Sequence, residues 1–268
     1  MKSKKMMIES DDAVSEVLGY SLILGIVVIS VGLMTVSSFP ILSDLKDSVF
    51  METSLESLSI VDGRISMVAY GTTPSQPSRF DLNGGKMIIG NETDSRVTIK
   101  VANSSGVWNE IFNKSLGKLE YVVGDQKIGY EDGGLFRKYP EGNTVMITPP
   151  EFTFNGWTLT FPIIRIEGND SISGKGVITI NAILNKYPPV IIYPNVSNNS
   201  LNPIFGKQVN ITIKSEYYKA WAKYVEEGTE AVPTTNDSTQ EVKVFINASS
   251  GDIYYLHIVE HEVNIVFQ

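Results

Sequence analysis

Residues 12–39 read DAVSEVLGYSLILGIVVISVGLMTVSSF, and this stretch decides the organisation of the chain. From Val17 to Phe39 the only ionisable side chain is the phenol of Tyr20. As a helix the run would measure about 34 Å, enough to cross a hydrocarbon core of about 30 Å. We therefore predict a transmembrane helix here, with the lipid bilayer as its first partner.

The flanks of this run predict how it is oriented in the membrane. Lys2, Lys4 and Lys5 precede it, and the positive-inside tendency keeps such a flank in the cytoplasm. The run is longer than the apolar core of a cleaved secretory signal, and no small-residue cleavage site follows at Pro40. The sequence predicts a single-pass protein of the cell membrane with an extracellular carboxyl-terminal head.

The helical pattern continues beyond the apolar run. Between Ile41 and Met67, apolar residues recur at helical spacing with charged residues between them: Leu42, Leu45, Val49, Leu55, Leu58 and Val61. Pro40 is expected to kink the helix without ending it. We predict a membrane and rod helix over residues 12–70, with a rod of about 50 residues, or about 75–80 Å.

Two further features go beyond a plain anchor. Glu16 lies at the edge of the apolar run, where a carboxylate is costly unless it is paired. Gly19, Gly25 and Gly32 recur on roughly one helical face. Small residues on one face let helices approach closely in lipid. The pattern predicts subunit assembly through these four residues.

The basic leader, the AVSEVLG segment at residues 13–19 and the apolar helix resemble an archaeal type IV prepilin. The resemblance implies that a prepilin peptidase cuts between Asp11 and Asp12, so that residues 1–11 are a leader. Glu16 would then be the fifth residue of the mature chain and would pair with the α-amine of a neighbouring pilin-like subunit. It also implies a pilus assembly machinery as partner. The family usually has a small residue before the cut, whereas Asp11 stands here.

Composition excludes several classes of function. The net charge is −8 without a basic block, which argues against electrostatic binding of nucleic acid. The chain has no cysteine, so disulfides, cysteine-ligated zinc and thiol catalysis are excluded.

The outer region is predicted to be rich in β-strands. Short runs of Val, Ile, Thr and aromatic residues alternate with turn residues: 86–89, 97–101, 119–123, 144–148, 158–166, 176–184, 209–214, 241–247 and 253–267. Trp157, Leu159, Phe161 and Ile163 are expected on one buried face. Asn83-Gly84-Gly85 and Asp132-Gly133-Gly134 predict turns.

The fold class that follows is α+β, with a mainly antiparallel, sandwich-like head behind the long helix. A Pro/Ser/Thr segment at residues 72–78 is expected as a linker or turn, and a second break falls at 186–203. We predict two β-rich parts, 72–187 and 188–268, the second packed on the first. It would contain a short helix near 215–227 with Ser215 as N-cap. The segments SEYYKAWAKYVEE and PPEFTFNGWTLTFPIIRIEG also resemble archaeal surface proteins of unknown function that carry such leaders.

Candidate chemistry is sparse. His257-Ile258-Val259-Glu260-His261 matches the inverted zincin motif, which requires a helix to bring both imidazoles to one metal. The alternation around it predicts a strand with two half-exposed histidines. Tyr217, Tyr218, Trp221 and Tyr224 favour core packing, with an aromatic binding platform as the alternative. We expect no enzyme, no cofactor and no metal.

Nine Asn-x-Ser/Thr sequons lie at or after residue 91, in the part predicted to be outside, against about three expected by chance. Eight are glycosylation candidates: Asn91, Asn103, Asn113, Asn169, Asn195, Asn198, Asn236 and Asn247. Asn210 is the ninth and falls inside a predicted strand.

The sequence thus favours a pilin-like extracellular structural subunit, and its length favours a minor subunit of a pilus. The main alternative is a permanently anchored surface protein whose head binds a glycan or an envelope partner. An extracellular hydrolase is the third reading.

Overall fold

The computed structural model describes the chain except residues 1–3, 91–94, 103–104, 195–207, 230 and 248–254, and except the side chains of 4–16, 40, 43, 44 and 247. The chain forms two compact units, Met1–Val49 and Phe50–Gln268. Helix α1 (Lys4–Ala69) supplies the described part of the first unit and the opening of the second.

In the first unit, α1 is helical throughout and continues through Pro40, as predicted. Its polar side chains are satisfied within the helix, because hydroxyls donate to the carbonyl oxygens four residues earlier. These hydroxyls belong to Ser30, Thr35, Ser37 and Ser38, with distances of 2.7–2.9 Å. Such a helix leaves few polar groups that need water.

At its other end, α1 stops at a glycine. Gly71 has φ 72°. Its N–H donates to the carbonyl oxygen of Val68, and the N–H of Thr72 reaches that of Met67. This is a Schellman arrangement, in which a residue without a Cβ adopts the left-handed conformation that ends the helix.

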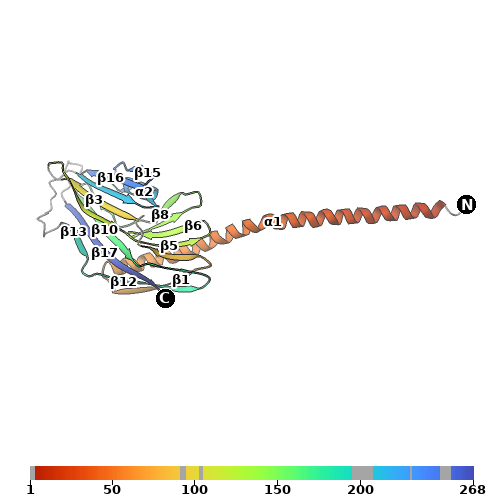
Figure 1. Cartoon of the computed structure of the whole chain (residues 1–268), viewed down its shortest axis with the longest axis horizontal. Coiled ribbons are helices and arrows are strands. Elements are labelled where there is room, and N and C mark those ends of the chain that lie inside the picture. The colour runs from red at the N-terminus through yellow and green to blue at the C-terminus, as the bar shows by residue number, and fades with distance from the viewer. Residues whose placement is uncertain (1–3, 91–94, 103–104, 195–207, 230, 248–254) are drawn as a thin grey trace. The chain divides into compact units, whose positions relative to one another are not determined.

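The second unit contains three sheets (Figure 1). The first contains, in spatial order, β1 (Ser75–Asp81), β12 (Val177–Leu184), β17 (Tyr255–Phe267), β10 (Thr158–Glu167) and β9 (Thr153–Phe154), with β13 (Val190–Tyr193) also on β17. The second contains β11 (Asp170–Ser173), β2 (Lys86–Gly90), β5 (Lys118–Val123), β6 (Gln126–Glu131), β7 (Gly134–Lys138) and β8 (Thr144–Thr148). The third contains β15 (Thr234–Asn236), β16 (Glu241–Asn247), β14 (Gln208–Lys214), β3 (Arg96–Ala102) and β4 (Trp108–Ser115).

Among the described strands, pairing is antiparallel except between β10 and β17, which run parallel over ten residue pairs from Thr158↔Tyr255 to Glu167↔Asn264. The predicted α+β class and the mainly antiparallel head are confirmed. The short helix is also confirmed, as α2 (Tyr218–Thr229), which lies against β16 and β8. The hydroxyl of Ser215 accepts a hydrogen bond from the backbone N–H of Tyr217 at 3.0 Å. Tyr217 is the residue directly before α2.

Two hydrophobic clusters form the core of this unit. One packs the last turns of α1 on the first two sheets, through Met51, Leu58, Val61, Ile65 and Val68. The other packs α2 on the third sheet and on the opening halves of β10 and β17. β10 and β17 contribute to both clusters and are neighbours in the first sheet. Strands from 188–268 therefore pair with strands from 72–187 within common sheets.

The apolar residues of the rod pattern differ in burial. Leu42, Leu45 and Val49 are exposed, whereas Leu58 and Val61 are buried and Leu55 is partly buried. The buried face begins only at Met51.

Two other expectations need correction. Residues 75–78, predicted as linker or turn, belong to β1. This strand lies at a sheet edge, where Pro77 is tolerated because β1 pairs on one side only among the described strands. Trp157, expected with Leu159 on the buried face, precedes β10 and is 50% exposed.

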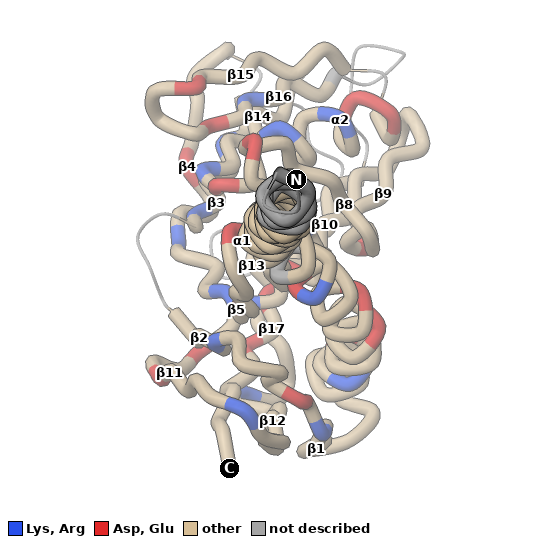
Figure 2. Tube along the Cα trace, turned by 90° about the vertical axis from the view of Figure 1, so that its right-hand side faces the viewer, with Lys and Arg blue, Asp and Glu red and all other residues tan. Residues whose placement is uncertain are grey.

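Figure 2 shows acidic and basic residues interspersed along the strands of the body.

The predicted turns are confirmed. Asp132 and Gly133 have φ 51° and 78° and close the hairpin between β6 and β7. Positive φ at both central residues is typical of a type I′ turn, which explains the Asp-Gly pair.

Candidate functional sites

The segment Val17–Phe39 is the clearest functional feature of the first unit. It is 23 residues long, its most apolar 18-residue stretch has a mean hydropathy of 2.4, and its residues are exposed throughout. Its length and composition suit a membrane crossing. The exposed surface is apolar enough to require a covering medium such as lipid or other helices.

The three glycines predicted for assembly lie on this segment. A Cβ placed on Gly19, Gly25 or Gly32 would meet no described atom within 4 Å. The glycines are therefore not required by packing within the described chain, and their role is open to an external helix. Asp11, Asp12 and Glu16 lie within α1, but their side chains are outside the described residues.

The sequons divide into three groups. Asn113, Asn169 and Asn236 are exposed. Asn210 is half-buried on β14, where its Oδ1 accepts a hydrogen bond from Thr212 at 3.4 Å. The remaining candidates lie outside the described residues, either whole or in their side chains: Asn91, Asn103, Asn195, Asn198 and Asn247.

The histidines of the inverted zincin motif lie on β17, as the alternation predicted. His257 is exposed, but His261 is buried, which corrects the expectation of two half-exposed rings. Nδ1 of His261 lies 2.6 Å from the carbonyl oxygen of Ala69, and burial lowers the pKa of this imidazole. Among the described residues, no three His, Asp or Glu side chains come together as a metal site.

The aromatic residues around α2 are core residues. Tyr217 and Trp221 are fully buried, and Tyr218 is 6% exposed. Tyr217 stacks on Phe136 with ring centroids 4.9 Å apart. The binding-platform alternative is not what the structure shows for these residues.

A buried carboxylate orders the polar groups beneath α2. Glu131 accepts hydrogen bonds from the hydroxyls of Ser95 and Ser215 at 2.7 and 3.0 Å and from the indole N–H of Trp221 at 2.9 Å. Burial raises the pKa of Glu131 and outweighs the effect of these donors. All four groups are buried in the core.

A second polar cluster centres on Glu216, in the segment between β14 and α2. Its carboxylate lies within 2.9–3.1 Å of the ammonium groups of Lys118, Lys127 and Lys138, which come from three neighbouring strands. The adjacent Glu120 accepts a hydrogen bond from the hydroxyl of Tyr217 at 2.8 Å. Burial raises the pKa of Glu120 to about 7. At Glu216 a hydrogen bond with Glu120 and the ammonium groups of Lys118 and Lys127 outweigh burial and hold the pKa below its usual range.

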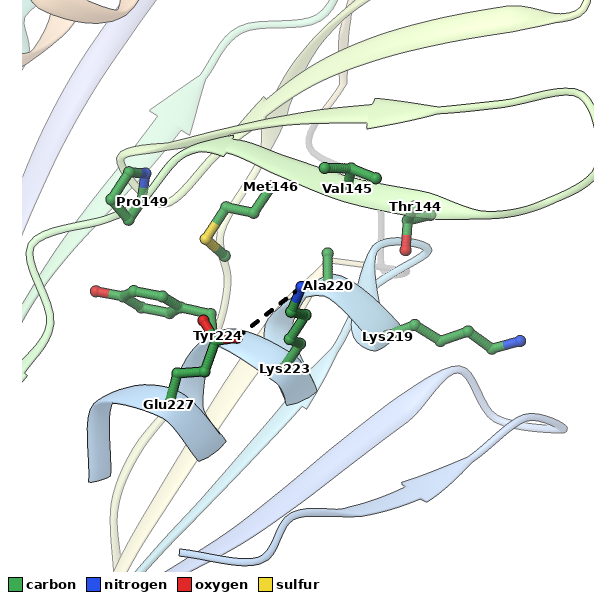
Figure 3. A pocket seen from close by; sticks show the side chains of 9 residues that line it. All are labelled: Thr144, Val145, Met146, Pro149, Lys219, Ala220, Lys223, Tyr224 and Glu227. Carbon is green, nitrogen blue, oxygen red and sulfur yellow. Dashed lines mark ion pairs between the residues drawn. The ribbon is translucent and has the colours of Figure 1, made fainter. Parts of the chain in front are cut away.

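A groove lies between β8 and α2 (Figure 3), with a volume of about 420 Å³. Met146, Ala220 and Tyr224 supply apolar lining, and Lys219 and Lys223 stand on the α2 side. The hydroxyl of Tyr224 donates to the carbonyl oxygen of Pro150 at 2.7 Å, which fixes its ring. We call this feature the β8–α2 groove.

Sequence reasoning did not find Glu131, Glu216 or the β8–α2 groove. Their partners lie far away along the chain, and the order of the strands that brings them together has no local signal. Only the isolated acidic residue inside a strand pattern, as at Glu120 and Glu131, could have indicated buried carboxylates.

Comparison with known proteins places the chain in a family. Two uncharacterized proteins of the archaeon Archaeoglobus fulgidus are similar to it. One is 24% identical over 302 residues, covering 96% of this chain and 97% of the relative. The other is 22% identical over 265 residues, covering 91% and 94%. No solved structure matches the chain. Residues 13–266 match the model of a family of unknown function, DUF7289, and the chain therefore belongs to that family.

Proposed function

We propose that this protein is a pilin-like structural subunit of the archaeal cell surface, held by α1 in the membrane before assembly. The observation that carries the proposal is Val17–Phe39, an apolar helical segment exposed along its whole length. A segment of this kind needs lipid around it before assembly and helices around it afterwards.

The beginning of the segment supports the proposal. Lys2, Lys4 and Lys5 precede it, which favours a cytoplasmic amino terminus and an extracellular body. The family match begins at residue 13, just after the proposed cut between Asp11 and Asp12. The proposed partners are a prepilin peptidase, other pilin-like subunits and their assembly machinery. The role is structural and involves no catalysis or cofactor.

Glu16 would pair with the α-amine of a neighbouring subunit, because a carboxylate in an apolar helix bundle needs an opposite charge. Exposed sequons such as Asn113, Asn169 and Asn236 would carry glycans on the body.

The test compares Glu16→Ala with Glu56→Ala, an exposed carboxylate on the same helix outside the apolar segment. In the native cell, Glu16→Ala should abolish recovery of the protein in sheared surface filaments while leaving its membrane level unchanged. Glu56→Ala should behave as wild type. If Glu16→Ala leaves filament recovery intact, or if the wild-type protein never appears in filaments, the proposal is wrong.

A second arm uses the glycines. Gly25→Leu adds a side chain where the described chain has open space, so membrane insertion should persist. Helices that approach through this face could no longer come close, and assembly should fall. Leu24→Ile on the same segment, which changes shape but adds no volume, is the matched control.

A permanently anchored surface binding protein is the second candidate, and the β8–α2 groove is the observation that favours it. This candidate predicts that Glu16→Ala leaves location and binding unchanged.

A further inference from the structure

The β8–α2 groove lies at a free edge of a sheet. Within the part of the chain that the structure describes, β8 has one strand neighbour, β7, and stands at the end of the second sheet. An edge strand directs backbone N–H and C=O groups outward in alternation, so it can pair with another strand.

β8 carries one irregularity, a shift of register with β7 between the pairs Leu135↔Thr148 and Phe136↔Met146, but no residue type that blocks its edge. Residues 144–148 read TVMIT, without the lysine or proline that commonly blocks edge pairing. Val145 and Ile147 are 45% and 39% exposed. They lie two residues apart, so they share one face of the strand and would continue an apolar row onto an added strand.

The other wall of the groove carries positive charge. Lys219 and Lys223 are both exposed and lie one helical turn apart on α2, which runs alongside β8 in Figure 3. Four residues of helix rise about 6 Å, while alternate residues of a strand are about 6.8 Å apart. Two carboxylates at alternate positions of a strand laid in the groove would therefore match the two lysines.

Local contacts leave these groups available. Lys223 lies 3.9 Å from Glu227, but both side chains are mostly exposed, so the pair is easily exchanged. The buried hydroxyl of Thr144 has no hydrogen-bond partner among the described residues and lines the groove. Figure 3 shows that it is directed toward α2.

We propose that the β8–α2 groove binds an extended, acidic segment of another protein, which adds to β8 as a further antiparallel or parallel strand. One face of the segment carries acidic side chains whose methylene groups cross Met146 and Ala220 and whose carboxylates reach Lys219 and Lys223. The other face is apolar and continues the row of Val145 and Ile147. Main-chain pairing supplies affinity, and the groove selects the side chains. This role is independent of whether α1 enters a filament.

The test uses the full chain in detergent micelles and a fluorescent peptide of alternating valine and glutamate, followed by fluorescence anisotropy. We expect saturable binding that weakens with added salt. A peptide of alternating valine and lysine of equal length should bind at least about tenfold more weakly, because it brings like charges to α2. The acidic peptide N-methylated at alternate residues, on the edge that would pair, should also lose binding, because it cannot donate to β8.

Variants locate the site. The double variant Lys219→Glu with Lys223→Glu should weaken binding about tenfold, and Lys175→Glu, an exposed lysine on another loop, should leave it unchanged. These side chains are exposed, so folding should be preserved, and circular dichroism of each variant checks it. Absence of binding by the acidic peptide would overturn the proposal. So would equal binding of the N-methylated peptide, or an unchanged affinity in the double variant.

Discussion

The indole N–H of Trp221 donates a 2.9 Å hydrogen bond to Oε1 of Glu131, and both side chains are buried. The carboxylate thereby links α2 to β6, and the hydroxyls of Ser95 and Ser215 complete its contacts through Oε2. Because these donors have no access to water, the carboxyl group at Glu131 is required to satisfy them.

Glu131→Ala should therefore destabilise the body by about 3 kcal/mol or more, because it leaves the indole N–H without an acceptor and opens a cavity. Glu131→Gln should cost less, since an amide oxygen can accept from Trp221 while its NH₂ group donates to the two serine hydroxyls. Thermal unfolding of the full chain, followed by tryptophan fluorescence, measures both. Equal losses in the two variants would contradict this hydrogen-bond assignment.

Asp62 gives the body a pH dependence. Burial raises the pKa of Asp62 from 3.8 to about 6, with Thr148 partly offsetting the shift through a hydrogen bond. The folded state therefore holds this proton more tightly than the unfolded state. The resulting stabilisation is present below about pH 4 and is lost as pH rises through about 6, by roughly 3 kcal/mol in total.

Asp62→Asn should remove this contribution and reduce the change of melting temperature between about pH 4 and pH 7, leaving the part due to other buried carboxyl groups such as Glu120. Asp47→Asn, on the same helix in the first unit, is the control and should retain the wild-type slope. A variant at Asp62 with the wild-type slope would show that this carboxyl titrates normally.

The Glu216 cluster should contribute more to stability than a surface ion pair. Glu216 is 13% exposed and contacts three lysines, so Glu216→Gln removes the carboxylate that Lys138 contacts and leaves Lys118 and Lys127 to share Glu120. We expect a loss of about 2–4 kcal/mol. Glu52 also binds a cation, Arg137 at 3.0 Å, but it is 64% exposed, and Glu52→Gln should cost less than about 1 kcal/mol. Urea unfolding of both variants tests the order, and a reversed order would contradict it.

The two histidines of β17 should also differ in their contribution to stability, because His261 is buried and His257 is exposed. His261→Ala removes the ring that contacts the carbonyl oxygen of Ala69 and stacks edge-on with Tyr70 at 5.0 Å, so it should lower the melting temperature by several degrees. His257→Ala changes an exposed side chain and should have little effect. Isothermal titration with zinc should show no binding that depends on both rings; such binding would restore the metal-site reading.

Local patterns predicted many of the elements. Apolar continuity predicted the long apolar helical segment Val17–Phe39, and alternation predicted strands such as β10 and β17 to within about two residues. Asp132 and Gly133 predicted their turn because few residues accept a positive φ.

Features that depend on strand order could not be predicted. The parallel pairing of β10 with β17 joins residues about a hundred positions apart, and no local pattern encodes it. Burial of Glu131, His261 and the Glu216 cluster follows from that order. The exposure of Leu42, Leu45 and Val49 also had no local signal, because exposed and buried apolar residues of α1 share one periodicity.

The most direct test of the central claim is the mass of the amino terminus in protein isolated from its native cell. A pilin-like subunit should begin at Asp12, with residues 1–11 removed and the apolar helix retained. A chain found intact from Met1 and dispersed as single copies in the membrane would contradict the account.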